Sequence, residues 1–415
     1  MRAAGPTGAA RRAKIAAMSS KVSNANQPAV AARPQPLGGL RVLDLSRVLA
    51  GPSVGRILAD LGAEVVKLEP PEGDLTRTFG RKVAGISGYF TQQNAGKRNV
   101  CVDLGAPGGP ALVADLAAVA DLVVENFRPG VLARFGLDYE RLSARNPRLI
   151  MLSISGFGQH GPESHRAAYA SVLHAESGVI ARQAAFNDTP PADPAQGFAD
   201  TYSGLHGLVG LLAALYHRER TGDGQHIDIA MIDAMTFSDD YAHAPLDGEE
   251  PENVGGFIWA TATGPILIAG GELRLVWRRL TEVHGVAEPQ PSGPRIEDKI
   301  AARQAAAQAW FDSFTDRADL HAALDRANLA WGDVKATGEV FASPTLASRG
   351  TLVAVDDRAG GTRTVMRAPQ RFSALATEVA GPAAHRGEHN REVLADWLSR
   401  DPDEVPPGVL LREER

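Results

Sequence analysis

Short apolar segments alternate with helical patterns through the first half of the chain. Residues 41–45 form an apolar run that predicts a buried strand, residues 53–61 predict a helix ending at Gly62, and residues 64–69 predict a second strand. A strand, a helix and a strand within about 30 residues are typical of the βαβ unit. The pattern therefore predicts an α/β fold built on a parallel sheet.

The same pattern recurs further along the chain. Three more strands are predicted, at residues 99–104, 121–125 and 149–155, and a helix is predicted at residues 109–119. Ligands of open α/β sheets bind at the carboxyl ends of the strands. We therefore expect three loops to meet at one site, namely residues 46–52, 126–130 and 156–163.

The second half of the chain predicts a long helix, a linker and a smaller module. Residues 204–218 carry Leu and Val at helical spacing, and a Gly-rich turn then leads into a strand over 226–231. Residues 240–257 are rich in Asp, Glu, Pro and Gly, which is typical of a linker. A smaller α+β module should follow, with a strand at residues 266–268 and two helices at 298–315 and 317–327. A final helix over residues 390–398 should close the fold.

Charge and cysteine content exclude several classes of protein. The 415 residues include 43 basic and 49 acidic side chains, a net charge of −6, so a dense basic face for nucleic acid or an anionic membrane is not expected. No run approaches the length of about 18 apolar residues that a membrane span needs. With Cys101 as the single cysteine, a disulfide framework is impossible, and a reducing cytoplasm is expected.

The basic residues are unevenly distributed. Residues 1–37 contain six basic and no acidic side chains, so the remaining 37 basic and 49 acidic residues give the body of the chain a charge of −12. This leader lacks a sustained apolar period and is predicted to be disordered. An organelle transit peptide and an over-long start, with Met18 as the initiator, remain alternatives.

The common cofactor and nucleophile motifs are missing from the sequence. There is no GxGxxG after a predicted strand, no GxxxxGK[ST] and no GxSxG. His385 to His389 do match the zinc motif HxxEH, which requires both histidines on one face of a helix. Because Pro382 lies just upstream and Gly387 lies inside the motif, a turn is predicted instead, and no metal site is expected.

Asp200 is the most informative carboxylate. It lies just before the predicted helix at 204–218, whose free N–H groups would stabilise its charge and hold its orientation. Small neighbours at Ser203, Gly204 and Gly207 would let a substrate approach closely. Asp200 is therefore either a simple helix cap or a nucleophile for an activated acyl group, and composition does not choose between them.

Several motifs, in a fixed order and spacing, resemble the family III CoA-transferases, the group that contains formyl-CoA transferase and carnitine CoA-transferase. The resemblance covers roughly residues 37–400. Its motifs are VLDLSRVLAGP at 42–52, LGAEVVKLE at 61–69, NAGKR at 94–98, VENFRPG at 124–130, LAAL at 212–215, TGDGQ at 221–225 and GEHN at 387–390.

The resemblance implies a fold, an assembly and a mechanism. It implies a large domain with a Rossmann-like sheet over residues 38–239, completed by 375–415, a linker and small domain over 240–374, and an interlaced homodimer. Asp200 occupies the position of the family nucleophile. A CoA-transferase would then move CoA between an acyl-CoA and a free carboxylic acid through an aspartyl-CoA thioester. Coenzyme A thioester is the substrate, and no tightly bound cofactor is expected.

The resemblance also implies which residues contact CoA. They are Leu49, Ala50, Val102, Asp103, Leu104, Asn126, Phe127, Arg128, Arg134, Arg166, Ala167, Ala168 and Tyr169. Arg47, which follows the first predicted strand, could also reach CoA or an acyl carboxylate. The arginines suit phosphate oxygens, and strand-end backbone groups suit the pantetheine amides. Arg47 and Arg77 hint at a dicarboxylate such as succinate, although the sequence does not define the donor or acceptor.

The sequence departs from the family pattern at two positions. Pro70 replaces an arginine that contacts phosphate, and Ala170 replaces a glutamate near the nucleophile, so His174 or Glu176 would have to assist, or no assistance is needed. Gly255 and Gly256 are the expected match to the family's glycine-rich covering loop.

Two other functions remain alternatives. The family includes alpha-methylacyl-CoA racemase, whose catalytic histidine is replaced here by Tyr169, a poor base at neutral pH. The second alternative is a non-catalytic partner subunit of a heteromeric CoA-transferase. The changes at Pro70 and Ala170 favour this alternative, and the retained Asp200 opposes it.

Overall fold

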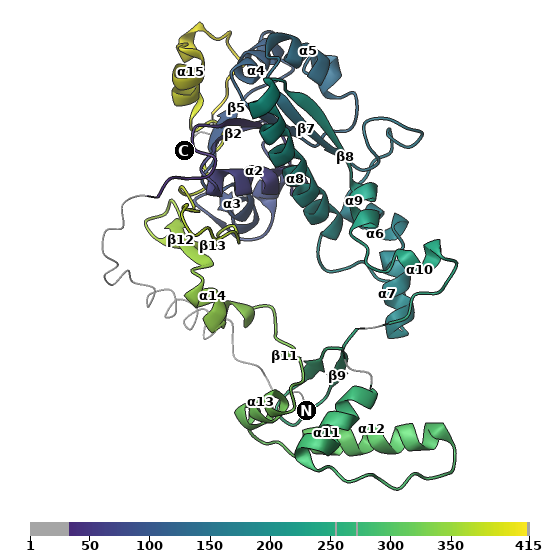
Figure 1. The fold of residues 1–415 in the computed structure, drawn as a ribbon. Coiled ribbons are helices and arrows are strands. Elements are labelled where there is room, and N and C mark those ends of the chain that lie inside the picture. Colours follow the sequence, from purple (N-terminus) through teal and green to yellow (C-terminus); the bar gives the residue numbers. More distant parts are fainter. Residues whose placement is uncertain (1–32, 254, 271–272, 413–415) are drawn as a thin grey trace. The chain divides into compact units, whose positions relative to one another are not determined.

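The structure, a computed structural model, describes residues 33–253, 255–270 and 273–412 (Figure 1). Most of the basic leader predicted over residues 1–37 therefore lies outside the described residues. The chain divides into two compact units. The larger unit takes the chain up to Ala242 and again from Ala347, and the smaller unit is His243–Leu346.

A six-stranded parallel sheet forms the centre of the larger unit and confirms the predicted α/β fold. Its strand order is β5-β2-β1-β6-β7-β8. The strand bounds are Arg41–Asp44 for β1, Glu64–Glu69 for β2, Arg98–Cys101 for β5, Leu122–Glu125 for β6, Ile150–Ser155 for β7 and Gln225–Ala230 for β8. Each agrees with a predicted strand to within three residues.

Helices cover both faces of this sheet (Figure 1). Adjacent strand residues point to opposite faces, so Val42 of β1 packs in one buried cluster and Leu43 in the other. Helices α2 (Ala50–Asp60) and α8 (Phe198–Thr221) contribute to the first cluster, and α4 (Gly109–Ala118), α5 (Tyr139–Arg145) and α15 (Asn390–Leu398) to the second. Burying both faces explains the continuous apolar runs of the strands.

Helix α8 begins earlier than the sequence pattern predicts. Its first residue is Phe198 and its N-cap is Gly197, so Asp200 lies in the first helical turn and does not cap the helix. The predicted start at residue 204 was wrong because the regular Leu and Val spacing begins at Leu205. The added turn is held by the fully buried Ala199 and by Phe198, which stacks on Tyr202 with 5.8 Å between ring centroids.

Further elements of the larger unit were not predicted. They are η1 (Leu75–Thr78), β3 (Lys82–Val83), β4 (Ile86–Ser87), α3 (Gly88–Asn94), η2 (Leu132–Phe135), α6 (Ala170–Glu176), α7 (Val179–Asn187), α9 (Met231–Phe237), β12 (Leu352–Asp356), β13 (Thr362–Met366) and η4 (Pro402–Glu404). The hairpin β12–β13 lies in a stretch that the sequence interpretation placed in the small domain. It groups with the larger unit, where Arg56 donates to Met366 O at 3.1 Å and Arg363 donates to Ile86 O at 3.1 Å.

The smaller unit is an α+β module, as predicted. Its antiparallel sheet has the order β11-β10-β9, and Trp259 stacks on Phe311 in the core with 4.7 Å between ring centroids. The elements are α10 (His243–Leu246), β9 (Phe257–Trp259), β10 (Ile266–Ile268), α11 (Leu273–His284), α12 (Ile296–Asp312), α13 (Arg317–Arg326), β11 (Trp331–Asp333) and η3 (Val340–Ala342), and α14 (Pro344–Ser348) crosses its boundary. Helices α10 and α11 were missed. Across the described ranges, no helix is long and apolar enough to cross a membrane.

Candidate active site

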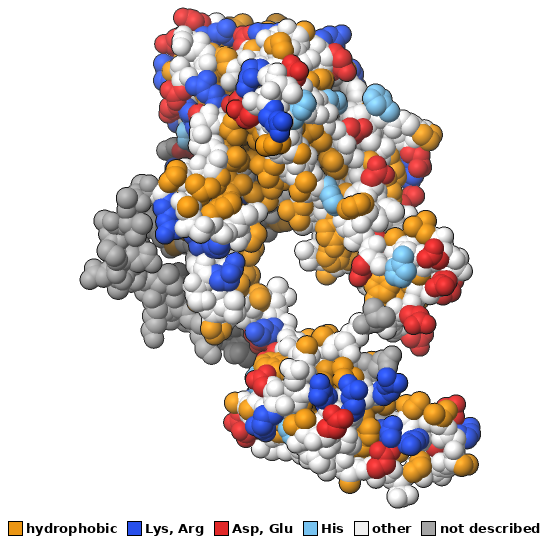
Figure 2. Space-filling model, viewed as in Figure 1, with side chains coloured by type: hydrophobic (Ala, Val, Ile, Leu, Met, Phe, Trp, Pro, Cys, Tyr) orange, Lys and Arg blue, Asp and Glu red, His pale blue; other side chains and the backbone are white. Residues whose placement is uncertain are grey.

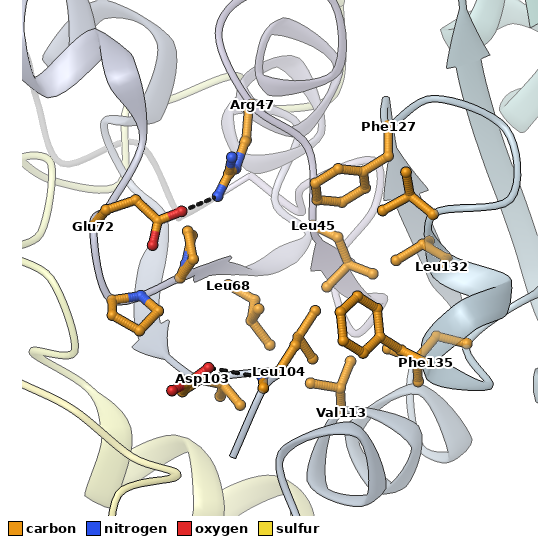
Figure 3. A pocket seen from close by; sticks show the side chains of 16 residues that line it. Leu45, Arg47, Leu68, Glu72, Asp103, Leu104, Val113, Phe127, Leu132 and Phe135 are labelled. Atoms are coloured by element: carbon orange, nitrogen blue, oxygen red, sulfur yellow. Dashed lines mark hydrogen bonds and ion pairs between the residues drawn. The ribbon is translucent and has the colours of Figure 1, made fainter. Parts of the chain in front are cut away.

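A cavity of about 470 Å³ opens at the carboxyl ends of β1, β2 and β6 and beside the end of β5 (Figure 3). Most of its lining is apolar: Leu45, Leu68, Val102, Leu104, Val113, Phe127, Val131, Leu132, Phe135 and Leu137. Arg47, Glu72 and Asp103 provide its charged groups. Five of the predicted CoA contacts, Arg47, Val102, Asp103, Leu104 and Phe127, thus line one cavity.

The loops after β1 and β6 meet at this cavity. The Asn126 side chain accepts the N–H of Arg47 at 2.7 Å and donates to its carbonyl at 2.8 Å. The Arg47 guanidinium pairs with Glu72 at 3.0 Å and lies 5.7 Å from the ring centroid of Phe127. Asn126 therefore fixes the backbone of Arg47, while the guanidinium stays at the cavity wall (Figure 3).

Two further predicted arginines lie beside the cavity. Arg134 is exposed in η2, whose Leu132 and Phe135 line the cavity, and Arg128 is exposed in the loop that leads to η2. Within the described ranges, neither guanidinium has a hydrogen-bond or ion-pair partner. Both remain available to an anionic ligand.

Asp200 lies where the amino ends of two helices meet. It belongs to the first turn of α8, and the backbone N–H of Ala50, the first residue of α2, lies close enough to its carboxylate to lower its pKa. Burial raises the pKa of Asp200 to about 6, although the Ala50 N–H acts to lower it. A Cβ on Gly204 would lie 2.8 Å from Ala50 O, so glycine is needed for the close approach of the two helices.

The two residues proposed to assist Asp200 are otherwise engaged. The N–H of Ala199 is a donor, so Nε2 of the buried His174 must accept it at 3.3 Å, and Nδ1 must carry the proton that bonds Asp193 at 2.7 Å. Glu176 accepts a hydrogen bond from Arg166 at 2.6 Å. These contacts leave neither His174 nor Glu176 with a proton for Asp200.

The last predicted segment, Arg166 to Tyr169, lies away from the cavity. Arg166 pairs with both Glu163 and Glu176 and lies 4.5 Å from the ring centroid of Phe157. Ala168 packs on Gly156, because a Cβ added to Gly156 would lie only 2.3 Å from the Cβ of Ala168. Tyr169 is 68% exposed. Ala167 contributes nothing to the cavity lining either. Of the three loops expected to converge, 156–163 does not line this cavity.

The other notable sequence features have structural explanations. His385 to His389 form the predicted turn, in which His389 Nδ1 accepts the N–H of Asn99 at 3.2 Å. Gly256 belongs to the smaller unit, where a Cβ would lie 2.7 Å from Ile268 O. Pro70 lines the cavity. In the part of the chain that the structure describes, no three His, Cys, Asp or Glu side chains are grouped to hold a metal ion.

Some residues near the site were missed by the sequence pattern. Leu68, Pro71 and Glu72 line the cavity, and their position at the end of β2 was the available signal, because ligands bind at strand ends. Tyr89 gives no such signal. Burial raises the pKa of its hydroxyl, and the negative charges of Asp200 and Asp74 raise it further.

Proteins of known structure share this fold and are similar to the chain in sequence. The fold matches that of a CaiB/BaiF family protein from Brucella suis, with a TM-score of 0.75 and 33% identity over 88% of this chain and all of that one. Rv3272 from Mycobacterium tuberculosis gives a TM-score of 0.72 at 30% identity, over 86% of this chain and 99% of that one.

Curated relatives define the enzyme class. Succinate–glutarate CoA-transferase of Agrobacterium fabrum is 34% identical, over 88% of this chain and 96% of its own. Succinyl-CoA–D-citramalate CoA-transferase of Chloroflexus aurantiacus is 33% identical, over 90% of this chain and 96% of its own. The sequence profile of CoA-transferase family III matches residues 37–390. The chain therefore belongs to CoA-transferase family III and is a transferase that uses CoA thioesters.

Proposed function

We propose that this enzyme transfers CoA between two carboxylic acids with Asp200 as the nucleophile. One observation carries the proposal: the Asp200 carboxylate lies in the first turn of α8 and close to the N–H at the start of α2, which acts to lower its pKa. The partial positive charges of two helix amino ends orient the carboxylate. Its raised pKa means that it is poorly solvated, and a less solvated carboxylate is the stronger nucleophile.

The proposed reaction needs no proton donor. A carboxylate oxygen of Asp200 attacks the thioester carbonyl of the donor acyl-CoA, the C–S bond breaks, and CoA leaves as the thiolate. The thiolate attacks the Asp200 carbonyl of the mixed anhydride, which releases the donor acid and leaves an aspartyl-CoA thioester. The acceptor carboxylate repeats these two steps in reverse order. Because every leaving group departs as an anion, the engagement of His174 and Glu176 is no obstacle.

The cavity in Figure 3 is the proposed site for the nucleotide end of CoA. Its apolar wall, with Phe127 and Phe135, suits the faces of an adenine ring. Arg128 and Arg134 are exposed beside it and suit the phosphate oxygens. Leu49 and Ala50 follow Arg47 in the same loop, so the loop after β1 connects this cavity to the carboxylate of Asp200.

We propose dicarboxylic acids as the substrate class. The two relatives described above are named for succinate or succinyl-CoA, so succinyl-CoA is the first donor to test. Arg77, which the sequence suggested for a second carboxylate, forms a hydrogen-bonded ion pair with Glu69 at 2.6 and 2.8 Å and also donates to Ala384 O. Arg47 therefore remains the better candidate of the two.

We also propose that the chain assembles as a homodimer, as the family resemblance implies. Four apolar side chains on one face of α8, Leu205, Val209, Leu212 and Tyr216, are between 40% and 66% exposed. They recur at helical spacing and form a stripe that a second chain would cover.

Trapping of the acyl-enzyme tests the proposed reaction. The enzyme is incubated with succinyl-CoA, quenched with hydroxylamine or borohydride, and digested for mass spectrometry. We expect modification at Asp200, none in Asp200→Asn, and normal modification in Asp233→Asn, a matched change in the first turn of α9. Absence of Asp200 modification with every acyl-CoA tested would refute the proposal, and α-deuterium exchange of a 2-methylacyl-CoA would identify a racemase.

A further inference from the structure

Val48 adopts a backbone conformation that its side chain disfavours. Its φ is +68°, in the left-handed region, and it is the only β-branched residue with positive φ in the described part of the chain. A β-branched residue is a genuine outlier there, and it persists only when its surroundings hold it. Val48 lies two residues before Ala50, whose N–H reaches Asp200.

Side chains from other elements hold the backbone just before Val48. Ser46 donates its N–H to Asp44 at 3.0 Å, and its carbonyl accepts from Lys67 Nζ at 2.7 Å. Arg47 has both its N–H and its carbonyl bonded to the Asn126 side chain. The loop therefore approaches Val48 with a fixed direction.

Asp74 holds Val48 itself. Its carboxylate oxygens lie 3.2 and 3.4 Å from the Val48 nitrogen, and the N–H of Val48 donates to them. Asp74 is 1% exposed and pairs with the equally buried Lys67 at 3.1 Å, while Thr76 donates both its N–H and its hydroxyl to the same carboxylate. A buried carboxylate with these partners stays charged and stationary, and a charged acceptor binds an N–H more strongly than a neutral one.

We infer that Asp74 is a positioning residue, which holds Val48 in the left-handed conformation so that the Ala50 N–H meets the Asp200 carboxylate. The inference rests on the proposed role of Asp200. Lys67 bonds both Asp74 and the Ser46 carbonyl, so this buried ion pair connects the start of the loop to its strained residue. If Val48 relaxed to negative φ, the direction of the chain into Leu49 and Ala50 would change, and the N–H would turn away from Asp200.

The test compares Asp74→Asn with the double variant that adds Val48→Gly. An amide accepts the Val48 N–H more weakly, so we expect kcat for CoA transfer from succinyl-CoA to fall about 10- to 100-fold. KM for succinyl-CoA should change little, because the cavity is untouched. Glycine adopts positive φ without strain, so Val48→Gly should restore most of kcat to Asp74→Asn and should not raise it in the wild type.

A second readout is the acid limb of the pH–kcat/KM profile. Moving the Ala50 N–H away removes an interaction that lowers the pKa of Asp200, so the limb should move to higher pH in Asp74→Asn and return in the double variant. Asp60→Asn is the matched control, because Asp60 is also buried and paired, with Arg56 at 2.9 Å, but lies at the far end of α2. It should lose stability without moving the limb.

Three results would overturn the inference: unchanged kcat in Asp74→Asn, no recovery on adding Val48→Gly, or an equal shift of the limb in Asp60→Asn. If Asp74→Asn does not fold, Lys67→Met is added to it, because this change removes the cation that Asp74→Asn leaves unpaired. The effect of Val48→Gly is then measured in the Asp74→Asn/Lys67→Met double variant. Trapping in the wild type separates the two proposals. Without an Asp200 adduct the proposed function fails, whereas an adduct with no rescue refutes only the role of Asp74.

Discussion

The environment of Asp200 makes it reactive at a cost in stability. Burial raises its pKa from 3.8 to about 6, which means that the fold disfavours the charged form. Between these two pH values the folded chain binds more protons at this group than the unfolded chain does. Stability therefore falls as pH rises through about 4 to 6, and the full cost is present above the folded pKa.

Asp200→Asn should for this reason stabilise the protein at neutral pH. A shift of about two pKa units corresponds to at most about 3 kcal/mol in the free energy of unfolding, and the asparagine does not bear this cost. We expect the variant to unfold at higher urea concentration than the wild type at pH 8, with the difference disappearing towards pH 4. Asp233→Asn should show no such pH-dependent gain. A variant less stable than the wild type at pH 8 would contradict this account.

At the scale of single elements, His174 stabilises the start of α8. The helix has no side-chain cap from Gly197, and the imidazole of His174 accepts the otherwise free N–H of Ala199. Its other nitrogen is held by Asp193, and its ring lies edge-on to Phe198 at 6.0 Å between centroids. A buried histidine thus takes the role of the usual serine or aspartate cap, and the residue that it caps, Ala199, lies one residue before Asp200.

Removal of this cap should weaken the helix start and the site together. We expect His174→Ala to lower the free energy of unfolding by about 2–4 kcal/mol, because it loses a cap and leaves a cavity. Asp193→Asn, which keeps the ring in place, should cost much less. Urea unfolding and hydrogen exchange at the first turn of α8 measure the effect. Equal losses in both variants would show that the hydrogen bond to Asp193, and not the cap, stabilises this region.

The elements also show how far the sequence predicts this fold. The strand β2 and the helix α15 were predicted at their observed bounds, because apolar runs in a parallel sheet and a helix after a Gly-containing turn give strong local signals. The first turn of α8 gave none, since Phe198 and Ala199 are recognised as helical only through tertiary packing. Helices α6 and α7 are short and weakly periodic, and were missed for the same reason.

The residues of the candidate site likewise include some that the sequence predicted and some that it did not. Arg47 and Phe127 follow predicted strands, so their placement at the cavity followed from the strand-end rule. Arg166 also follows a strand, yet two carboxylates occupy its guanidinium. Asp74 and Val48 were not predicted, because a positive φ and a buried acceptor for its N–H are visible only in three dimensions.

Charge at the scale of the whole molecule is compatible with a CoA ligand. The net charge of −6 disfavours extended polyanions, which need a continuous basic surface. A nucleotide needs only a few cations, and Arg128 and Arg134 lie exposed beside the apolar cavity. Most other arginines of the larger unit are held in ion pairs, as Arg77 and Arg166 are. Local availability, and not total charge, therefore decides which anion binds.

An apolar stripe on α8 is exposed at the surface of the larger unit. Leu205, Val209, Leu212 and Tyr216 recur at i, i+4, i+7 and i+11, so they share one face of the helix, while Leu211 and Ala214 are buried on the other side. Figure 2 shows hydrophobic side chains gathered over the part of the larger unit that α8 crosses. A helix that is apolar on both faces is normally covered on both.

A charge placed in this stripe should therefore separate the proposed homodimer. We expect Val209→Asp, at a position that is 65% exposed, to shift the mass measured by light scattering from two chains to one, because an unpaired carboxylate cannot be buried without large cost. Val119→Asp, at an exposed aliphatic position after α4, is the matched control and should leave the dimer intact. Circular dichroism establishes that both variants fold. A wild-type mass of one chain, or a Val209→Asp protein that stays dimeric, would show that something other than a second copy covers this face.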